Sequence, residues 1–209
     1  MPTVLLIRHA ENEYVRKGRL AGRLSGVRLN ERGREQSDQL AEALKQAPIK
    51  AVYSSPLDRT METAAPIGAA HGLEVVERPG LIELDFGDWQ DKTLKSLRRR
   101  KLWKTVQSRP SLMRFPNGET FSEAQIRVAA EIVALVRQHK PKDLIACVSH
   151  SDLIKLAMAY YLGLSLDLFQ RIMIAPASIS TLFFGEGHVQ VVNMNQTVGG
   201  AFRGRKPEK

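Results

Sequence analysis

The sequence predicts an α/β protein, a three-layer α/β/α sandwich with a mostly parallel central sheet. Short, continuous apolar runs at residues 4–7 and 144–148 are typical of strands buried on both faces. Segments of helical periodicity separate the apolar runs, and such alternation favours a parallel sheet covered on both sides. The length of 209 residues fits one domain with an elaboration.

Three strands and two helices are expected in the first half of the chain. Leu40 and Leu44 have the i, i+4 spacing of one helix face. Pro56 is tolerated in the first turn of a helix, whereas Pro66 predicts a kink or break further along. In order, the expected elements are a strand at 4–7, a Gly- and Arg-rich loop at 9–33, a helix at 34–46, a strand at 50–53, a helix from Pro56 to about Gly72, and a strand at 73–76.

The second half repeats the alternation and ends in a hairpin. Thr120 or Ser122 is expected to cap a long helix. Its apolar stripe is predicted to be Ile126, Ala129, Ala130, Val133 and Val136. In order, the expected elements are a helix at 93–106, a turn at 115–118, a helix to about 139, a strand at 143–148, a helix at 152–162, and strands at 179–184 and 189–193.

We expect a single domain over residues 1–195, with a cap or insertion around 92–118. A basic, flexible tail is expected over 196–209. The single cysteine, Cys147, excludes an intramolecular disulfide and a four-cysteine zinc site. The N-terminus resembles a strand more than a signal peptide, and no apolar run reaches membrane-spanning length, so a cytoplasmic location without membrane association is expected.

The chain is basic, with 31 Lys and Arg against 22 Asp and Glu and a net charge of +9. A basic protein can bind nucleic acid, an anionic membrane or an acidic small substrate. Aromatic residues make up 6% of the chain, and the RNA-binding signature with its stacking aromatics is absent. Nucleic acid is therefore an unlikely partner, and a small anionic metabolite is favoured.

Two histidines follow two buried strands directly. His9 comes after residues 4–7, and His150 after 144–148. The carboxyl ends of parallel strands form the ligand-binding edge of such a sheet, so both side chains are expected there. Arg8 and Arg59 offer forked donors that match phosphate oxygens. The pattern predicts handling of a phosphoryl group.

That chemistry needs a nucleophile and an acid. A neutral His9 ring can attack phosphorus, and a carboxylic acid must protonate the departing alkoxide. The loop at residues 81–87 supplies two candidates, Glu83 and Asp85.

Four motifs in order resemble those of the histidine phosphatase superfamily, also called the phosphoglycerate mutase-like family. They are Leu6-Ile7-Arg8-His9-Ala10-Glu11, Ser54-Ser55-Pro56-Leu57-Asp58-Arg59-Thr60, Leu81-Ile82-Glu83-Leu84-Asp85-Phe86-Gly87-Asp88-Trp89 and Val148-Ser149-His150-Ser151. The resemblance spans roughly residues 3–185 and implies the phosphoglycerate mutase-like fold.

The resemblance also implies roles. His9 would form a phosphohistidine, Arg8, Arg59 and His150 would clamp the phosphoryl oxygens, and Glu83 would give and then take the proton. No metal and no cofactor are implied. Asp85 is expected to cap its loop, and Trp89 to pack beneath it.

The sequence departs from the family pattern in three places. Ala10 replaces a common glycine, which puts the conformation of its loop in question. Val15 stands where a phosphate-contacting asparagine is common, and Asn12 is the candidate substitute. Ser151 replaces another glycine, and its N–H remains available as a donor.

Substrate contacts are also predicted for Arg23, as one of several basic residues that could bind a second anionic group; the others are Arg19, Arg28 and the cluster at 98–101. The short segment after Glu83 favours a phosphatase acting on a small phosphorylated metabolite. A phosphomutase, or a non-catalytic phosphate- or nucleic-acid-binding module, is the alternative. A monomer or homodimer is expected. Neither a cysteine-phosphatase loop nor a Walker loop is present.

Overall fold

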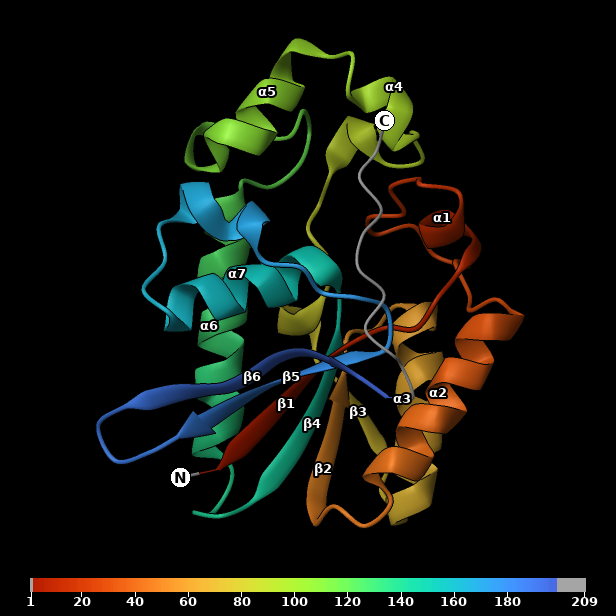
Figure 1. Cartoon of the computed structure of the whole chain (residues 1–209), viewed down its shortest axis with the longest axis vertical. Helices are drawn as coiled ribbons and strands as arrows, with labels where there is room; N and C mark the ends of the chain where they lie inside the picture. Colours follow the sequence, from red (N-terminus) through yellow and green to blue (C-terminus); the bar gives the residue numbers. More distant parts are fainter. Residues whose placement is uncertain (1, 199–209) are drawn as a thin grey trace.

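The computed structural model describes residues 2–198 and contains one six-stranded sheet in the order β3-β2-β4-β1-β5-β6 (Figure 1). The strands are β1 (Thr3–Arg8), β2 (Ile49–Ser54), β3 (Val75–Glu77), β4 (Leu144–Ser149), β5 (Ser178–Phe184) and β6 (Val189–Thr197). The first four strands in the sheet order pair in parallel, and β5 and β6 are antiparallel. The predicted α/β class with a mostly parallel sheet and a terminal hairpin is confirmed.

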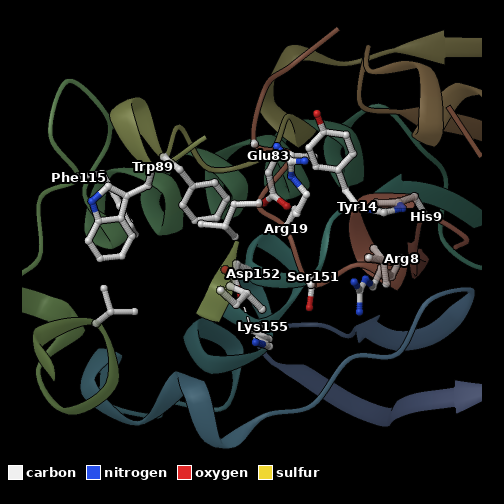
Figure 2. Close-up of a pocket in the computed structure, with 18 of the residues that line it drawn as sticks. Arg8, His9, Tyr14, Arg19, Glu83, Trp89, Phe115, Ser151, Asp152 and Lys155 are labelled. Carbon is white, nitrogen blue, oxygen red and sulfur yellow. Dashed lines mark hydrogen bonds and ion pairs between the residues drawn. The ribbon is translucent and has the colours of Figure 1, made fainter. Parts of the chain in front are cut away.

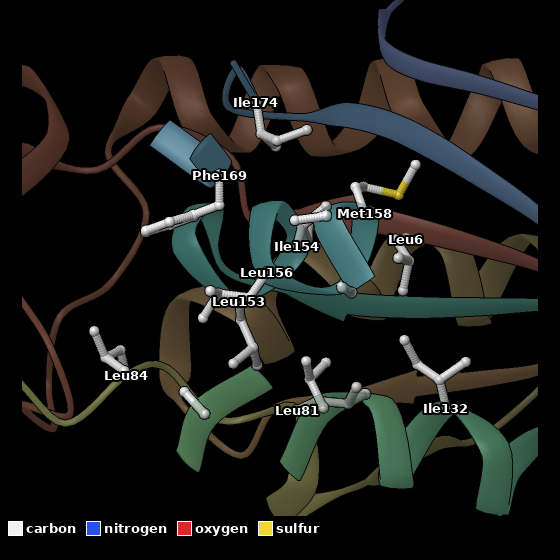
Figure 3. Packing of buried hydrophobic residues seen from close by; sticks show 14 of the residues in the cluster. Leu6, Leu81, Leu84, Ile132, Leu153, Ile154, Leu156, Met158, Phe169 and Ile174 are labelled. Carbon is white, nitrogen blue, oxygen red and sulfur yellow. The ribbon is translucent and has the colours of Figure 1, made fainter. Parts of the chain in front are cut away.

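Alternating side chains of the central strand β1 pack into two separate cores. Leu5 and Ile7 belong to the core beneath α2 (Glu31–Leu44) and α3 (Asp58–His71). Val4 and Leu6 belong to the core beneath α6 (Phe121–Arg137) and α7 (Ser151–Tyr161) (Figure 3). Because both faces of β1 are buried, its end is held rigidly at the edge of the sheet.

Two capping arrangements move element boundaries from their predicted positions. Helix α2 starts at Glu31, three residues early, because the Asn30 side chain accepts a hydrogen bond from Gly33 N–H (2.8 Å). Strand β3 starts only at Val75, because Leu73 N–H bonds the carbonyl of Gly68 and completes the end of α3.

Of the kink or break expected at Pro66, the break is wrong, because α3 runs unbroken from Asp58 to His71. Proline removes one intrahelical hydrogen bond, but Ala64, Ile67 and Gly68 on either side are buried. Packing of this face therefore keeps the helix intact.

The predicted apolar stripe of α6 is partly wrong. Thr120 caps the helix through a capping box with Glu123, but Ile126 is 65% exposed. The buried face instead consists of Phe121, Ala124, Val128, Ala129, Ile132, Leu135 and Val136. This row buries larger side chains than the row through Ile126, so it faces the sheet.

The helix predicted at 93–106 is two helices, α4 (Leu94–Leu97) and α5 (Lys101–Ser108). Leu97 and Trp103 both pack toward the core. They are six positions apart, and residues with that spacing do not lie on the same face of one continuous helix. A break at the extended Arg100 lets both side chains turn inward. These helices lie above the carboxyl ends of the strands (Figure 1).

Five short helical segments complete the chain: α1 (Glu13–Arg16) and the 3₁₀ turns η1 (Pro79–Leu81), η2 (Gly87–Trp89), η3 (Pro110–Leu112) and η4 (Leu166–Arg171). Strand β6 runs to Thr197, so Gln196 and Thr197 pair with β5 and are not part of a tail. The rest of the predicted tail, apart from Val198, lies outside the described residues. Within residues 2–198, no helix has the length and apolar character to cross a membrane.

Candidate active site

The two predicted histidines lie side by side at the edge of the sheet. His9 directly follows β1, and its backbone N–H donates to the carbonyl of Ser149 (2.9 Å), which extends the pairing with β4 by one residue. His150 directly follows β4 and caps α7. The centroids of the two rings are 5.3 Å apart. Parallel pairing of β1 and β4 therefore sets the spacing of the two rings.

The hydrogen bonding of His9 fixes its tautomer. Nδ1 lies 2.8 Å from the carbonyl oxygen of Ala10. A carbonyl only accepts, so Nδ1 carries the proton and Nε2 keeps its lone pair. Burial, followed by the charges of Arg59 and Arg8, holds the pKa of His9 well below its ordinary value. The ring is neutral and ready to act as a nucleophile.

Alanine at position 10 leaves the backbone unstrained. Ala10 is fully buried and is not among the described residues with positive φ. The backbone N–H of Ala10 donates to the hydroxyl oxygen of Thr63 (3.0 Å). The same hydroxyl donates its own proton to the backbone carbonyl of Arg59 (2.7 Å). The side chain of Thr63 thus ties the His9 loop to the helix that carries Arg59.

Arg8 and Arg59 present buried donors beside His9. Arg8 ends β1 and donates from Nη1 to the carbonyl of Ile174 (2.6 Å). Arg59 lies in the first turn of α3 and donates from Nη2 to the carbonyl of Gly22 (2.7 Å). Arg8 Nε and Arg59 Nε and Nη1 are buried without a hydrogen-bond partner among residues 2–198. Buried, uncompensated donors of this kind favour an anion.

Asn12 adds a neutral donor to the same region. Its Oδ1 accepts from Val15 N–H (2.9 Å) and caps α1, so the amide nitrogen takes no part in the cap. That nitrogen is buried and has no partner within the described chain, and Asn12 lines the cavity. This position fits the expectation that Asn12 contacts phosphate in place of the asparagine that is common at position 15. Val15 itself lines the cavity with an apolar side chain.

Glu83 has the environment of a proton donor. Its Oε1 accepts from Leu84 N–H (2.9 Å), and Oε2 lies 3.8 Å from Nδ1 of His150. Burial and, next to it, the negative charge of Asp152 raise the pKa of Glu83 to about 7, against the opposing effect of Arg59. A substantial fraction of this carboxyl is therefore protonated at neutral pH.

His150 is neutral as well. Arg59 Nη2 lies 3.3 Å from Nδ1, and Ser55 Oγ lies 2.8 Å from Nε2. A guanidinium only donates, so Nδ1 accepts and Nε2–H donates to Ser55. Burial, and then Arg59 and His9, keep the pKa of His150 well below its ordinary value.

The first two turns of α7 supply the polar wall of the cavity. Ser151 and Asp152 begin the helix, and Lys155 follows one turn later. Lys155 Nζ lies 3.0 Å from Asp152 Oδ1 and 3.3 Å from Gln170 Oε1. All four side chains line the cavity.

Arg23 occupies a different place from the one predicted. Its Nε donates to the backbone carbonyl of Glu83 (2.9 Å), and its Nη2 pairs with Glu119 (2.9 Å). Arg23 is not among the residues that line the cavity, so it supports the Glu83 loop.

Asp85 caps that loop as expected, since its Oδ1 accepts from Gly87 N–H (2.9 Å). Arg28 and residues 98–101 also lie outside the lining, whereas Arg19 is part of it.

A second arginine holds the Glu83 loop from the other side. Arg127 on α6 donates from Nη1 to the carbonyls of Gly80 (3.0 Å) and Ile82 (2.8 Å). Its Nε and Nη2 bind both carboxylate oxygens of Glu119 (3.1 and 3.0 Å). The backbone on both sides of Glu83 is therefore fixed by charged side chains.

Arg8, His9, Asn12, Arg59, Glu83 and the side chains of α7 named above line one cavity of about 380 Å³ (Figure 2). His150 is not part of this lining and lies fully buried beside Arg59. The motifs alone assign no role to Ser55, which lies within the second motif, or to Asp152, which follows the fourth. Trp103 falls within the predicted cap around 92–118, from which substrate specificity is expected, but the sequence does not single it out. Within residues 2–198, no group of three His, Cys, Asp or Glu side chains is arranged to hold a metal ion.

Comparison with known proteins identifies the family. The model described as the histidine phosphatase superfamily (branch 1) matches residues 4–197. The chain therefore belongs to this superfamily, and the resemblance predicted from the four motifs is confirmed.

The relatives include phosphatases and mutase-like proteins. Phosphoserine phosphatase 1 of Hydrogenobacter thermophilus is 29% identical over 94% of this chain and 93% of its own length. A probable phosphoglycerate mutase, GpmB, of Enterobacter sp. is 29% identical over 89% of this chain and 86% of its own. A structure of phosphoserine phosphatase from Entamoeba histolytica in complex with 3-phosphoglyceric acid has a TM-score of 0.85, 27% identity, and coverage of 94% and 98%. The predicted fold and phosphatase class are confirmed.

Proposed function

We propose that this protein hydrolyses phosphate monoesters of small metabolites in two steps through a phosphohistidine on His9. The observation that carries the proposal is a nucleophile and an acid in complementary protonation states. His9 keeps a free Nε2 lone pair, while Glu83, within the same cavity, has a pKa of about 7. This pairing is what attack on phosphorus with protonation of the leaving group requires.

In the first step, His9 Nε2 forms a bond to phosphorus as the bond from phosphorus to the ester oxygen breaks. Glu83 gives its proton to that oxygen, so an alcohol leaves and Glu83 becomes a carboxylate. Arg8, Arg59 and Asn12 donate to the phosphoryl oxygens with their unpartnered nitrogens. In the free site His150 Nδ1 accepts from Arg59 Nη2. The negative phosphoryl group favours uptake of a proton from solvent at Nδ1, which turns this nitrogen from an acceptor into a donor.

In the second step, the Glu83 carboxylate takes a proton from a water molecule whose oxygen attacks phosphorus. The bond between phosphorus and His9 Nε2 breaks, inorganic phosphate leaves, and Glu83 is protonated again. The same carboxyl thus serves as acid and then as base, and its pKa near neutrality suits both roles.

The test measures phosphate release from p-nitrophenyl phosphate, with a chelator present. We expect turnover by the wild type, loss of about 10³-fold or more for His9→Ala, and no loss for His188→Ala. His188 is a matched control because it lies in the exposed turn between β5 and β6. Turnover that survives His9→Ala would show that His9 is not the nucleophile.

A mutase or a binding module is the alternative to a phosphatase. Either would give a folded wild type that binds phosphate without releasing it from esters, and a binding module for nucleic acid would show salt-dependent binding without turnover. The structure offers no support for a second phosphate clamp, because Arg19 and Lys155, the cavity cations away from His9, are both paired with carboxylates.

We place the reaction in the cytoplasm, in a single domain of monomers or homodimers. A free, buried Cys147 is consistent with a reducing compartment. Cell fractionation tests the location, and light scattering of the purified protein tests the oligomeric state.

A further inference from the structure

The cavity extends well beyond the space that a phosphoryl group needs. Arg8, His9, Asn12, Arg59 and Glu83 form one end. The remaining lining comes largely from apolar side chains: Leu20, Phe86, Trp89, Leu94, Trp103, Val106, Phe115 and Phe121. Figure 2 shows Trp89 and Phe115 on the side of the cavity away from Arg8 and His9, with Glu83 between them.

The apolar end is built from aromatic rings in contact with each other. Trp89 and Trp103 stack, with centroids 6.3 Å apart and an angle of 16° between the ring planes. The ring of Phe115 stands edge-on to Trp89 (5.3 Å) and to Phe86 (5.1 Å). Trp89, Phe86 and Phe115 are at most 4% exposed, so the wall is rigid and preformed. Such a wall binds a flat, apolar group without reorganising.

The charges around the cavity disfavour a second anionic group on the substrate. Arg19 is paired with Asp91 (2.6 Å), and Lys155 with Asp152 (3.0 Å). Of the described residues lining the cavity, these are the cations away from the phosphoryl end. The Lys155–Asp152 pair carries no net charge, so it offers an anion no uncompensated cation. Trp89 Nε1 is buried and has no partner within residues 2–198, so it offers one neutral donor.

We infer that the substrates of this enzyme are phosphate monoesters whose leaving group is uncharged and carries an aromatic or similarly flat apolar part, held against the stacked Trp89 and Trp103 on the cap side. The inference rests on the proposed function and assigns its substrate class. Esters with a carboxylate on the leaving group are poor substrates, because no unpaired cation in the described lining meets that charge.

The experiment compares alkyl phosphates. Every leaving group is then an alcohol, and the esters differ mainly in whether that alcohol bears an aromatic ring, no substituent or a charged group. We measure kcat/KM for 2-phenylethyl phosphate, ethyl phosphate, phosphoserine and 3-phosphoglycerate. The expected result is a preference of about tenfold to hundredfold for 2-phenylethyl phosphate over ethyl phosphate. Phosphoserine and 3-phosphoglycerate should fall at or below ethyl phosphate.

Variants test whether the aromatic wall causes the preference. Trp103→Ala should lower the ratio of 2-phenylethyl to ethyl phosphate by about tenfold. Leu102→Ala is the matched control, because Leu102 is the neighbouring residue on α5 but is 41% exposed and does not line the cavity. This control should keep the wild-type ratio.

Binding without turnover gives a second readout. Both tryptophans of the chain line the cavity, so their fluorescence reports on its occupancy. In His9→Ala, 2-phenylethyl phosphate should change the fluorescence and bind about tenfold more tightly than ethyl phosphate.

Two outcomes would overturn the inference while the proposed function stands: phosphoserine or 3-phosphoglycerate preferred over 2-phenylethyl phosphate, or a preference that Trp103→Ala leaves unchanged. If folded wild type hydrolyses none of the esters, the proposed function itself fails. The fluorescence titration then decides the inference separately, and equal affinities for 2-phenylethyl and ethyl phosphate would refute it.

Discussion

Among single residues, Glu83 sets the pH range of the proposed reaction. Its protonated form is the one that donates, and its pKa is about 7 because it is buried. His9 must be neutral, and its pKa lies well below 6.5 because of burial and Arg59. Lowering the pH through 7 therefore protonates Glu83 before it protonates His9. We expect kcat/KM to be high on the acid side and to fall as the pH rises above about 7.

Glu83→Gln tests this assignment. The amide cannot donate an acidic proton, so kcat/KM for ethyl phosphate should fall by about 10²- to 10⁴-fold. The decline above pH 7 should also disappear in this variant. Titration of the substrate is common to both proteins, so the difference between the two profiles belongs to the enzyme. A variant that keeps the wild-type decline would assign it to another group.

The main side chains of the site could be predicted one by one, but Arg23 could not. Arg8 ends β1, and His9 and His150 directly follow β1 and β4, so the sequence places all three at one edge of the sheet. The partner of an arginine depends on which carboxylate folds beside it. Arg23 meets Glu119, a residue 96 positions away, and no local pattern encodes that contact.

Among the elements, helix α6 controls the loop that carries the acid. Arg127 binds the carbonyls of Gly80 and Ile82 and both oxygens of Glu119. It does not line the cavity, so it acts by positioning Glu83. In Arg127→Ala, kcat/KM for ethyl phosphate should fall by about tenfold to hundredfold. The fall in kcat/KM for p-nitrophenyl phosphate should be much smaller, because kcat/KM reports the steps up to departure of the leaving group and p-nitrophenolate leaves without a proton.

The control for this variant is Arg137→Ala, which removes an exposed arginine from the last position of the same helix. It should leave both rates unchanged. A structural defect alone would lower the two substrates equally in Arg127→Ala, so equal losses would contradict a positioning role.

Periodicity predicted that α6 exists but not which of its faces is buried. The helix has apolar side chains on more than one face, and Ile126, which the pattern places on the buried face, is exposed. The predicted cap shows a similar limit. Leu97 and Trp103 fit no single helical face, and both pack against the core because the chain breaks between them. In both places, contacts with distant parts of the chain decide the local structure.

In the whole molecule, the two cores hold the sheet so that β1 and β4 end together, and the buried donors gather at that point. Burial of the Arg8 and Arg59 guanidinium groups close together is costly, and a bound anion offsets the cost. The unfolded chain has no such site, so phosphate should stabilise only the folded protein.

The expected result is a rise in Tm with inorganic phosphate, of about 5–10 °C at 100 times its Kd, from about 2.7 kcal/mol of linkage. A chain of net charge +9 also attracts anions over its whole surface, so sodium chloride of equal ionic strength is the necessary comparison. In Arg59→Met most of the phosphate-specific shift should be lost, because two of the buried unpartnered donors are removed. In Arg16→Met, which alters an exposed arginine paired with Glu13, the shift should persist. Equal shifts in chloride, or in both variants, would show that phosphate stabilises the molecule through its surface charge and not through the cluster at the ends of β1 and β4.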